Sequence, residues 1–262
     1  MIIDAFPFFN EIDLLEIRLN ELSSIVDYFV VCESKKTFSN KDKPLFFLEN
    51  ANKFQKFQDK ILHVVLESLP DGDDPWVREY AQRKTIIKFF NRFPNDSVCM
   101  LSDADEIPSL ESIRSACLLL QKQNIVLVKH LFCHGYLNRL LTNEQNGFWA
   151  YWGGTRVAKK SFWDESKMGR EYEDTEVKGG WHFRNIGDAQ SLCLKLKSYS
   201  HHRDVGHLGL KWEDITEEQV RRRMESGEEL CQGGFKSFTL PDGLLPNYVL
   251  SNKENFKTLL YH

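Results

Sequence analysis

The stretch Val98-Cys99-Met100-Leu101-Ser102-Asp103-Ala104-Asp105-Glu106-Ile107-Pro108 decides how this chain is expected to fold. Its first four residues are apolar and have strand character, and an Asp-x-Asp-Glu cluster follows at once. Pro108 then suits the first position of a helix, where its missing N–H loses no hydrogen bond. In an open α/β sheet, the residues just beyond a buried strand face the crevice where ligands bind. The pattern therefore predicts an acidic site at the carboxyl edge of a sheet.

Two neighbouring carboxylates at such an edge are suited to a divalent cation. Ions of the Mg²⁺ and Mn²⁺ type prefer oxygen ligands and commonly take their remaining ligands from substrate phosphates. Acidic residues also favour the positive end of a helix dipole, so a plain first-turn role is the alternative. The buried strand and the third acid favour the metal site. We therefore expect an enzyme that handles a nucleoside diphosphate.

Composition restricts the class of protein further. The chain has 262 residues, of which 42% are hydrophobic and 13% aromatic, enough for a sizeable core. A net charge of −4 gives no basic footprint, so we expect no nucleic-acid partner. No apolar run reaches about 18 residues, so no transmembrane segment is expected. The first residues lack a signal-peptide pattern. We expect a cytoplasmic protein, with peripheral contact at the inner membrane face as the alternative.

Cysteine usage fits the same compartment. The six cysteines form no Cys-x-x-Cys pair, and Cys32 and Cys99 lie within apolar runs. A free thiol in such a run behaves as a small hydrophobic side chain. We therefore expect reduced core cysteines in place of a zinc site or a disulfide framework.

Strands and helices alternate over the first two-thirds of the chain. Strands are expected at 2–6, 25–32, 61–66, 97–101 and 125–130, with helices at 11–22, 76–93 and 108–121. Beyond about residue 135 short strands and loops are expected, with helices at 188–198, 216–226 and 251–260. This alternation predicts an α/β fold with a mostly parallel sheet. We expect a single domain over 1–262, with a nucleotide-binding half (about 1–134) and an acceptor half (about 135–262).

Several segments together resemble glycosyltransferases of family 17, the group of β-1,4-mannosyl-glycoprotein β-1,4-N-acetylglucosaminyltransferases. Each segment alone is weak evidence for the resemblance, but the whole set in this order is specific for the family. The segments are Asp4-Ala5-Phe6-Pro7-Phe8-Phe9-Asn10-Glu11, Asp13-Leu14-Leu15-Glu16-Ile17-Arg18, Glu33-Ser34 with Thr37-Phe38-Ser39, Arg78-Glu79 with Gln82-Arg83, Ser102–Pro108, and Gly180-Trp181-His182.

The resemblance implies a GT-A fold, which is a Rossmann-like mixed sheet with flanking helices and a metal-binding Asp-x-Asp. It also implies transfer of a sugar from a nucleotide sugar to a glycan acceptor, with inversion at the anomeric carbon. UDP-GlcNAc is the donor in this family. After residue 200 the chain departs from the family pattern, so acceptor recognition is not carried over.

The expected metal ion is Mn²⁺ or Mg²⁺. Asp105 is the expected metal ligand, and Asp103 is expected to contact the ribose or the metal. The ion would bridge the diphosphate and stabilise its charge as UDP departs. His182 follows a Gly-Gly-Trp turn and is a candidate third ligand; a structural hydrogen bond is the alternative, and His202 is a rival ligand. Glu106 is assigned to the catalytic group as the acid that orients these ligands, with a first-turn acid as the alternative.

Further residues are expected to contact the nucleotide sugar. Asn10 and Glu11 follow the first strand and Glu33 follows the second, so all three are expected at the crevice. Helix capping is an equal explanation for Asn10 and Glu11. Arg78 and Arg83, on the helix before the acidic strand, are expected to contact the diphosphate. For Arg83, a surface pair with the acid four residues earlier is the alternative.

An inverting transfer needs a general base that accepts the proton of the acceptor hydroxyl. The acid-rich run 171–174 precedes the Gly-Gly-Trp-His segment, and Asp174 is chosen from it over Glu173. Of the tryptophans, Trp149, Trp152 and Trp181 are candidates for stacking on sugar rings, although core packing is expected for at least two of them.

Two other classes of protein stay open. A metal-dependent phosphohydrolase or nucleotidyltransferase would use the same acidic cluster and would need further carboxylates from Asp71, Asp73 and Asp74. The loop that holds these three is more readily explained as a turn before the next helix. The second alternative is a catalytically inactive sugar-binding module. A polar, cationic loop at 35–44 is expected to be mobile in any of these proteins.

Overall fold

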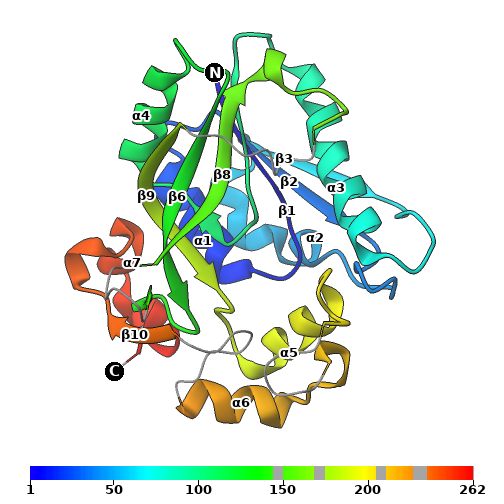
Figure 1. Ribbon diagram of the computed structural model, residues 1–262, viewed down its shortest axis with the longest axis vertical. Helices are drawn as coiled ribbons and strands as arrows, with labels where there is room; N and C mark the ends of the chain where they lie inside the picture. Colours follow the sequence, from blue (N-terminus) through cyan, green and yellow to red (C-terminus); the bar gives the residue numbers. More distant parts are fainter. Residues whose placement is uncertain (144–149, 168–174, 205–210, 227–234, 262) are drawn as a thin grey trace.

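The computed structural model describes residues 1–143, 150–167, 175–204, 211–226 and 235–261. Its strands form one mixed sheet in the order β10-β7-β6-β8-β4-β1-β2-β3, and β9 pairs with both β5 and β6. Figure 1 shows this sheet crossing the molecule between its helices. The strands are β1 (Ile2–Pro7), β2 (Tyr28–Ser34), β3 (Ile61–Leu66), β4 (Val98–Leu101), β5 (Glu106–Ile107), β6 (Ile125–His134), β7 (Arg139–Asn143), β8 (Tyr151–Lys159), β9 (Glu176–Arg184) and β10 (Phe235–Thr239).

The described helices are of two kinds. The α-helices are α1 (Ile12–Leu22), α2 (Phe46–Asn50), α3 (Pro75–Phe89), α4 (Leu110–Leu119), α5 (Ala189–Ser198), α6 (Glu217–Ser226) and α7 (Asn247–Ser251). Short 3₁₀ helices are η1 (Ala51–Phe57), η2 (Phe90–Arg92), η3 (Lys160–Phe162), η4 (Trp212–Asp214), η5 (Asp242–Leu244) and η6 (Lys253–Leu259).

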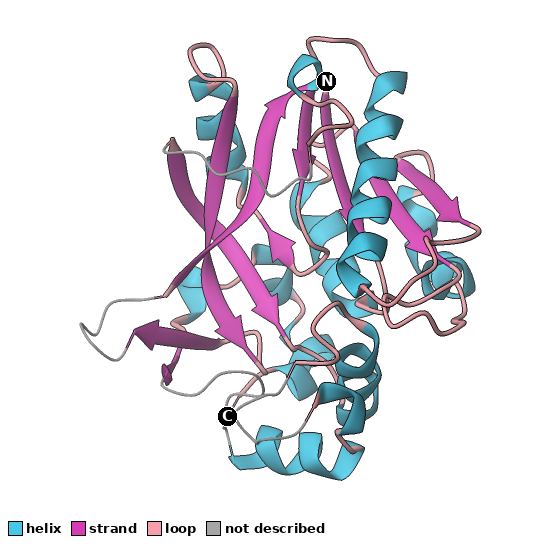
Figure 2. Cartoon of the chain, turned by 45° about the vertical axis from the view of Figure 1, so that its right-hand side comes forward, coloured by secondary structure: helices cyan, strands magenta, loops and turns pink. Residues whose placement is uncertain are grey.

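The amino-terminal half of the sheet is parallel, because β1 lies between β2 and β4 and all three run in one direction. Strand β8 then pairs antiparallel with both β4 and β6, which makes the whole sheet mixed. Helices cover both faces of this sheet (Figure 2). The α/β fold with a mixed sheet and flanking helices, expected from the sequence, is confirmed.

Side-chain alternation along the strands builds a core on each face of the sheet. In β2, Phe29 and Val31 pack on the face covered by α1 and α4, within the larger apolar cluster. Val30 and Cys32 pack on the opposite face against α3. Separately, α5, η4 and α6 enclose a small apolar cluster of their own. Helices α5 and α6 lie beyond the carboxyl end of β1 (Figure 1). Because β4 runs parallel to β1, this is also the end of the sheet that carries the acidic loop.

Most predicted elements are confirmed with ends shifted by a few residues, and one predicted helix is wrong. The strand at 61–66 is observed with the same bounds. Helix α4 begins at Leu110 with Ser109 as its N-cap, so Pro108 is not the first helical residue. Helix α1 has Glu11 as its N-cap in place of Asn10. The single closing helix expected at 251–260 is wrong: α7 ends at Ser251, and a 3₁₀ helix follows after Asn252, whose φ of −133° is not helical.

The five described cysteines are free thiols, and four of them are buried: Cys32, Cys99, Cys133 and Cys193. Burial raises the pKa of the Cys32 thiol to about 12, so it stays protonated as a core residue. Among the described helices, none combines the length and the apolar character needed to span a membrane.

Candidate active site

A buried arginine supports the acidic loop that follows β4. Arg18 of α1 is fully buried and donates to both carboxylate oxygens of Asp4, at 2.7 Å from Nε and 2.6 Å from Nη2. Its Nη1 donates to the backbone carbonyls of Asp103 (3.0 Å) and Glu106 (2.9 Å). The planar guanidinium fixes these acceptors relative to one another. One side chain therefore joins β1, α1 and the backbone of the loop.

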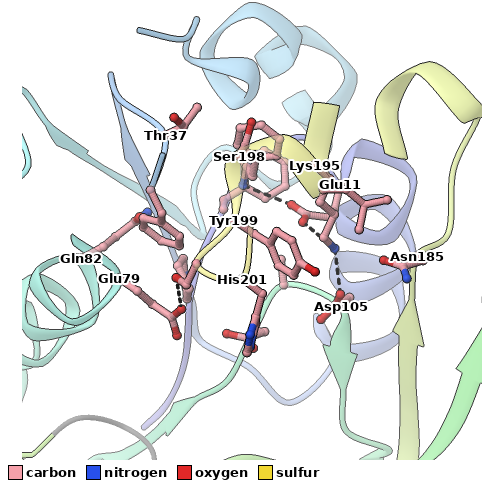
Figure 3. A pocket seen from close by; sticks show the side chains of 18 of the residues that line it. Glu11, Thr37, Glu79, Gln82, Asp105, Asn185, Lys195, Ser198, Tyr199 and His201 are labelled. Carbon is pink, nitrogen blue, oxygen red and sulfur yellow. Dashed lines mark hydrogen bonds and ion pairs between the residues drawn. The ribbon is translucent and has the colours of Figure 1, made fainter. Parts of the chain in front are cut away.

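The acidic loop opens on a cavity of about 530 Å³, a size typical of small-molecule sites. Its walls come from the carboxyl ends of β1 and β9, the loop after β2, the inner face of α3 and the last turns of α5. Figure 3 shows side chains from these separate elements around the cavity. Five of the residues considered for the site line it, namely Glu11, Asp103, Asp105, Trp152 and His182.

Strand pairing brings His182 to Asp105. In the antiparallel pairing of β5 with β9, Glu106 lies opposite His182. The backbone N–H of Phe183 donates to the carbonyl of Asp105 at 2.8 Å. As a result, His182 Nε2 lies 3.6 Å from Asp105 Oδ1 at the cavity.

A lysine that the sequence analysis missed completes the cluster. Lys195 of α5 places its Nζ 2.9 Å from Asp105 Oδ2 and 3.0 Å from Glu11 Oε1. Figure 3 shows its ammonium group between these two carboxylates. The helical pattern of α5 predicts only an amphipathic helix, and no local signal reveals a partner 90 residues away along the chain.

The protonation states in the cluster follow from burial and from these neighbours. Burial lowers the pKa of His182 to about 4, although the charge of Asp105 opposes the shift. Burial alone would raise the pKa of Asp105, but Lys195 and His182 outweigh it, and the net pKa is lowered. Burial would lower the pKa of Lys195, but Asp105 and Glu11 outweigh it and the pKa is raised. At neutral pH the cluster thus holds a neutral imidazole at His182, an ionised carboxylate at Asp105 and an ammonium ion at Lys195.

The pair of Asp105 and His182 fits a divalent cation. Two ligands that each lie about 2.0–2.2 Å from one ion are roughly 3–3.6 Å apart. The observed 3.6 Å between His182 Nε2 and Asp105 Oδ1 is too long for a hydrogen bond and agrees with that spacing. His182 Nδ1 has no hydrogen-bond partner within the described residues. Among these residues, therefore, no hydrogen bond to Nδ1 fixes which ring nitrogen carries the proton.

The protein supplies few ligands for such an ion. In the described part of the chain, no group of three or more His, Cys, Asp or Glu side chains is arranged to hold a metal. An ion held by two side chains takes its other ligands from water or from a bound phosphate. The donor set therefore suits an ion that binds together with a phosphorylated ligand.

Asp103 reaches the cavity from a fixed position. Its carboxylate accepts a hydrogen bond from Nη2 of Arg83, whose Nε donates to Glu79 Oε1 at 3.2 Å. Arg83 itself is buried and does not line the cavity. In this structure Arg83 positions Asp103 and Glu79, which do line the cavity, and its direct contact with a diphosphate stays a prediction.

Glu106 also acts through its neighbours. Its Oε1 accepts from the indole N–H of Trp152 at 2.7 Å, and its Oε2 accepts from the backbone N–H of Asp103 at 2.9 Å. Glu106 is buried and does not line the cavity, whereas Trp152 does. The structure thus gives Glu106 the orienting position. The first-turn alternative does not hold, because α4 begins at Leu110.

Glu33 lies elsewhere than expected. It has the same parity in β2 as Phe29 and Val31, so its side chain points under α2 and away from the crevice. It accepts from the backbone N–H of Phe47 at 3.1 Å and lies 2.9 Å from His63 Nε2. Glu33 is fully buried and does not line the cavity, so its expected contact with the nucleotide stays a prediction that this placement does not favour.

Arg78 and Asn10 also have structural partners. Arg78 donates to the carbonyls of Phe38 and Gly72, both at 2.6 Å, and so joins the loop after β2 to the turn before α3. Asn10 Nδ2 donates to the carbonyl of Ser191 in α5 at 3.3 Å. Neither side chain lines the cavity. Asp174 lies outside the described residues.

The loop after β2 forms one wall of the cavity. Lys36, Thr37, Phe38 and Lys43 of this loop all line it. The backbone N–H of Ser39 donates to the carbonyl of Ser198 at 3.2 Å, which links the loop to the end of α5. The sequence alone predicts a mobile loop at 35–44 and gives none of its residues a part in the site.

The mixed sheet, with a cavity beyond the carboxyl ends of β1 and β4, has the GT-A architecture of glycosyltransferases. The sequence places the chain more narrowly. The model of glycosyltransferase family 17 matches residues 1–261, and the chain belongs to this family.

Curated relatives match part of this chain. It is 35% identical over 121 residues to the β-1,4-mannosyl-glycoprotein 4-β-N-acetylglucosaminyltransferases of Rattus norvegicus and Homo sapiens. The match covers 43% of this chain and 22% of each relative, so it spans about a fifth of their length.

Two solved structures show weaker similarity. The 2-C-methyl-D-erythritol 4-phosphate cytidylyltransferase of Francisella tularensis has a TM-score of 0.42 at 11% identity, over 74% of this chain and 97% of that one. The glucosyl-3-phosphoglycerate synthase of Mycobacterium tuberculosis, in complex with Mn²⁺, UDP and phosphoglyceric acid, has a TM-score of 0.34 at 15% identity, over 61% and 56%. No residue of the site is assigned from either structure.

Proposed function

We propose that this chain transfers N-acetylglucosamine from UDP-GlcNAc to a hydroxyl group of a glycan acceptor, with inversion at the anomeric carbon and with Mn²⁺ or Mg²⁺ as cofactor. Family membership supports sugar transfer, and the names of the rat and human relatives support N-acetylglucosamine. The observation that carries the proposal is the meeting of Asp105 and His182 at a cavity large enough for a nucleotide sugar.

In this proposal the donor diphosphate lies against the cluster at the end of β4. Asp105 and His182 hold the ion, and Asp103 faces the ribose or the same ion. When bound, the ion supplies Lewis-acid stabilisation of the charge on the departing diphosphate. Lys36 and Lys195 line the same cavity and add positive charge for the phosphate oxygens.

The transfer step exchanges one bond at the anomeric carbon for another. The acceptor oxygen bonds to that carbon while the bond from the carbon to the β-phosphate oxygen breaks, and the acceptor proton moves to a carboxylate. Asp174 remains our proposed base. Trp152 offers an aromatic surface to a sugar next to His182, its ring centroid 5.1 Å from the imidazole. Glu106 is a positioning residue in this step, because it holds the Trp152 indole.

The nucleotidyltransferase or phosphohydrolase alternative would need more acids at the site. Asp71, Asp73 and Asp74 do not line the cavity. The carboxylate of Asp74 instead caps α3 by accepting from the backbone N–H of Trp76 at 2.9 Å. This arrangement agrees with the turn that the sequence favoured for that loop.

A screen of nucleotide sugars tests the proposed function. With Mn²⁺ present, we expect the fastest release of free nucleotide from UDP-GlcNAc, and we expect chelation by EDTA to abolish it. Asp105→Asn should lower the rate by about 100-fold or more, because it removes a charged ligand of the ion. Asp59→Asn, at an exposed aspartate outside the cavity, is the control and should leave the rate unchanged.

Three results would count against the proposal. Turnover of phosphodiesters without turnover of any nucleotide sugar would favour the phosphohydrolase. Binding of glycans without release of nucleotide would favour the inactive sugar-binding module. Full activity of the Asp105→Asn variant would remove Asp105 from the site.

A further inference from the structure

The ammonium group of Lys195 occupies the centre of the candidate active site. It lies 2.9 Å from Asp105 Oδ2 and 3.0 Å from Glu11 Oε1, and its side chain is 20% exposed, toward the cavity. The three groups come from three places in the fold: the loop after β4, the N-cap of α1 and the last turn of α5. This contact joins α5 to the end of the sheet.

Asp105 cannot serve two cations equally well. One of its oxygens contacts Lys195, and the other faces His182 at 3.6 Å. A divalent ion between Asp105 and His182 would share the same carboxylate with a positive charge already bound to it. Like charges repel, so Lys195 in this position weakens the binding of an ion that arrives alone.

A diphosphate changes this balance. Lysine is a compact charge on a flexible four-carbon stem, and phosphate oxygens are strong partners for it. Because Lys195 lines the cavity, its ammonium can turn to an anionic ligand there without movement of the backbone of α5. That turn would free the second oxygen of Asp105 for the ion.

We propose that Lys195 couples the binding of the nucleotide to the binding of the metal ion; this inference rests on the proposed function. In the empty site, Lys195 contacts both Glu11 and Asp105. When the nucleotide diphosphate binds, Lys195 contacts its phosphate oxygens and releases Asp105 to the ion. Each ligand then strengthens the binding of the other by the same factor, as linkage requires.

Calorimetric titration of the protein with Mn²⁺, in the absence and in the presence of saturating UDP, measures this coupling. For the wild type we expect UDP to tighten Mn²⁺ binding by about 10-fold or more, within the usual range of coupling between sites. In Lys195→Gln we expect Mn²⁺ alone to bind about 5-fold more tightly, and UDP to tighten Mn²⁺ binding at least about 3-fold less than in the wild type, because only the direct contact between ion and phosphate remains. The first change follows from the freed Asp105, and the second from the lost contact with phosphate.

Lys197→Gln is the matched control. Lys197 lies on the same helix and its replacement removes the same charge, but its side chain does not line the cavity. Its Mn²⁺ and UDP affinities should equal those of the wild type. A second variant, Glu11→Gln with Lys195→Met, removes one charge of each sign, so it keeps the net charge of the site. It should show the same loss of coupling even where Lys195→Gln fails to fold.

The outcomes separate this inference from the proposed function. If both variants keep the wild-type coupling within about twofold, Lys195 serves only to attach α5 to the sheet and the inference is wrong. In that case the proposed function stands. If the wild type binds no UDP at any Mn²⁺ concentration, the proposed function and the inference both fail.

Discussion

At the scale of single residues, the surroundings of Asp105 and His182 lower both pKa values, so that the carboxylate is ionised and the imidazole is neutral, as a metal site needs. Burial keeps the imidazole neutral by lowering its pKa to about 4, and neutral imidazole is the form that binds metals. The neighbouring charge of Lys195 keeps Asp105 ionised despite its burial. A third residue, Arg18, fixes the backbone of the loop that carries Asp105, because its Nη1 donates to the carbonyls of Asp103 and Glu106.

His130 makes stability depend on pH. Its Nδ1 lies 2.8 Å from the carbonyl of Gly179, which only accepts, so Nδ1 carries the proton and Nε2 accepts from Thr155 at 2.9 Å. Burial lowers the pKa of His130 to about 3, below its ordinary value of 6.5. The folded state therefore resists protonation. The contribution of neutral His130 to the stability of the folded state is complete above about pH 6.5 and is lost as the pH falls toward about 3.

We expect His130→Gln to flatten this pH dependence. Glutamine can replace both hydrogen bonds and takes up no proton. Between pH 6 and pH 4 the free energy of unfolding of the wild type should fall about 1.4 kcal/mol per pH unit more steeply than that of the variant. Urea denaturation at a series of pH values measures both slopes. Equal slopes would show that His130 is not buried in its neutral form.

Position within a local pattern explains which site residues the sequence could predict. Asp103 and Asp105 follow a buried strand directly, so the strand alone places them at the edge of the sheet. Glu33 lies one residue before the end of β2, and its side chain turns under α2. There it accepts a hydrogen bond from the backbone N–H of Phe47, a contact that no pattern within the strand predicts. Lys195 depends on partners distant in sequence, and no pattern within α5 identifies them.

At the scale of elements, the pairing of β9 with β5 decides where His182 lies. Gly180 has a φ of +85°, and a Cβ atom built there would lie 2.1 Å from the carbonyl oxygen of Ile107. Only glycine allows β9 to approach β5 so closely with this backbone conformation. The close packing of β9 against β5 therefore requires glycine in the Gly-Gly-Trp-His segment, and this packing places His182 next to Asp105.

Gly180→Ala should destabilise the protein by about 2–5 kcal/mol, through backbone strain and the clash with Ile107. Gly243→Ala is the control, because nothing lies within 4 Å of the Cβ atom it would add. That variant should stay within about 0.5 kcal/mol of the wild type. Chemical denaturation of both proteins gives the comparison. Equal midpoints would mean that β9 does not require the close approach at Gly180.

At the scale of the whole molecule, the alternation of strands and helices was sufficient to predict an α/β fold. It predicted a mostly parallel sheet because βαβ units leave a periodic signal in the sequence. The prediction holds for β1 to β4, which pair in parallel, and the rest of the sheet is mixed. The antiparallel strands β8 and β10 were expected only as short strands after residue 135. Their pairing joins segments far apart in the chain, such as β8 with β4, and no local pattern encodes it.

The central claim is that Asp105 and His182 hold an ion that also binds a nucleotide diphosphate. Pulsed electron paramagnetic resonance of Mn²⁺ bound in the presence of UDP detects both neighbours of the ion at once. In the wild type we expect coupling to ¹⁴N of an imidazole and to ³¹P of the diphosphate. We expect His182→Gln to remove the ¹⁴N coupling alone. A wild-type spectrum with phosphorus coupling and no imidazole coupling would show that His182 does not bind the ion.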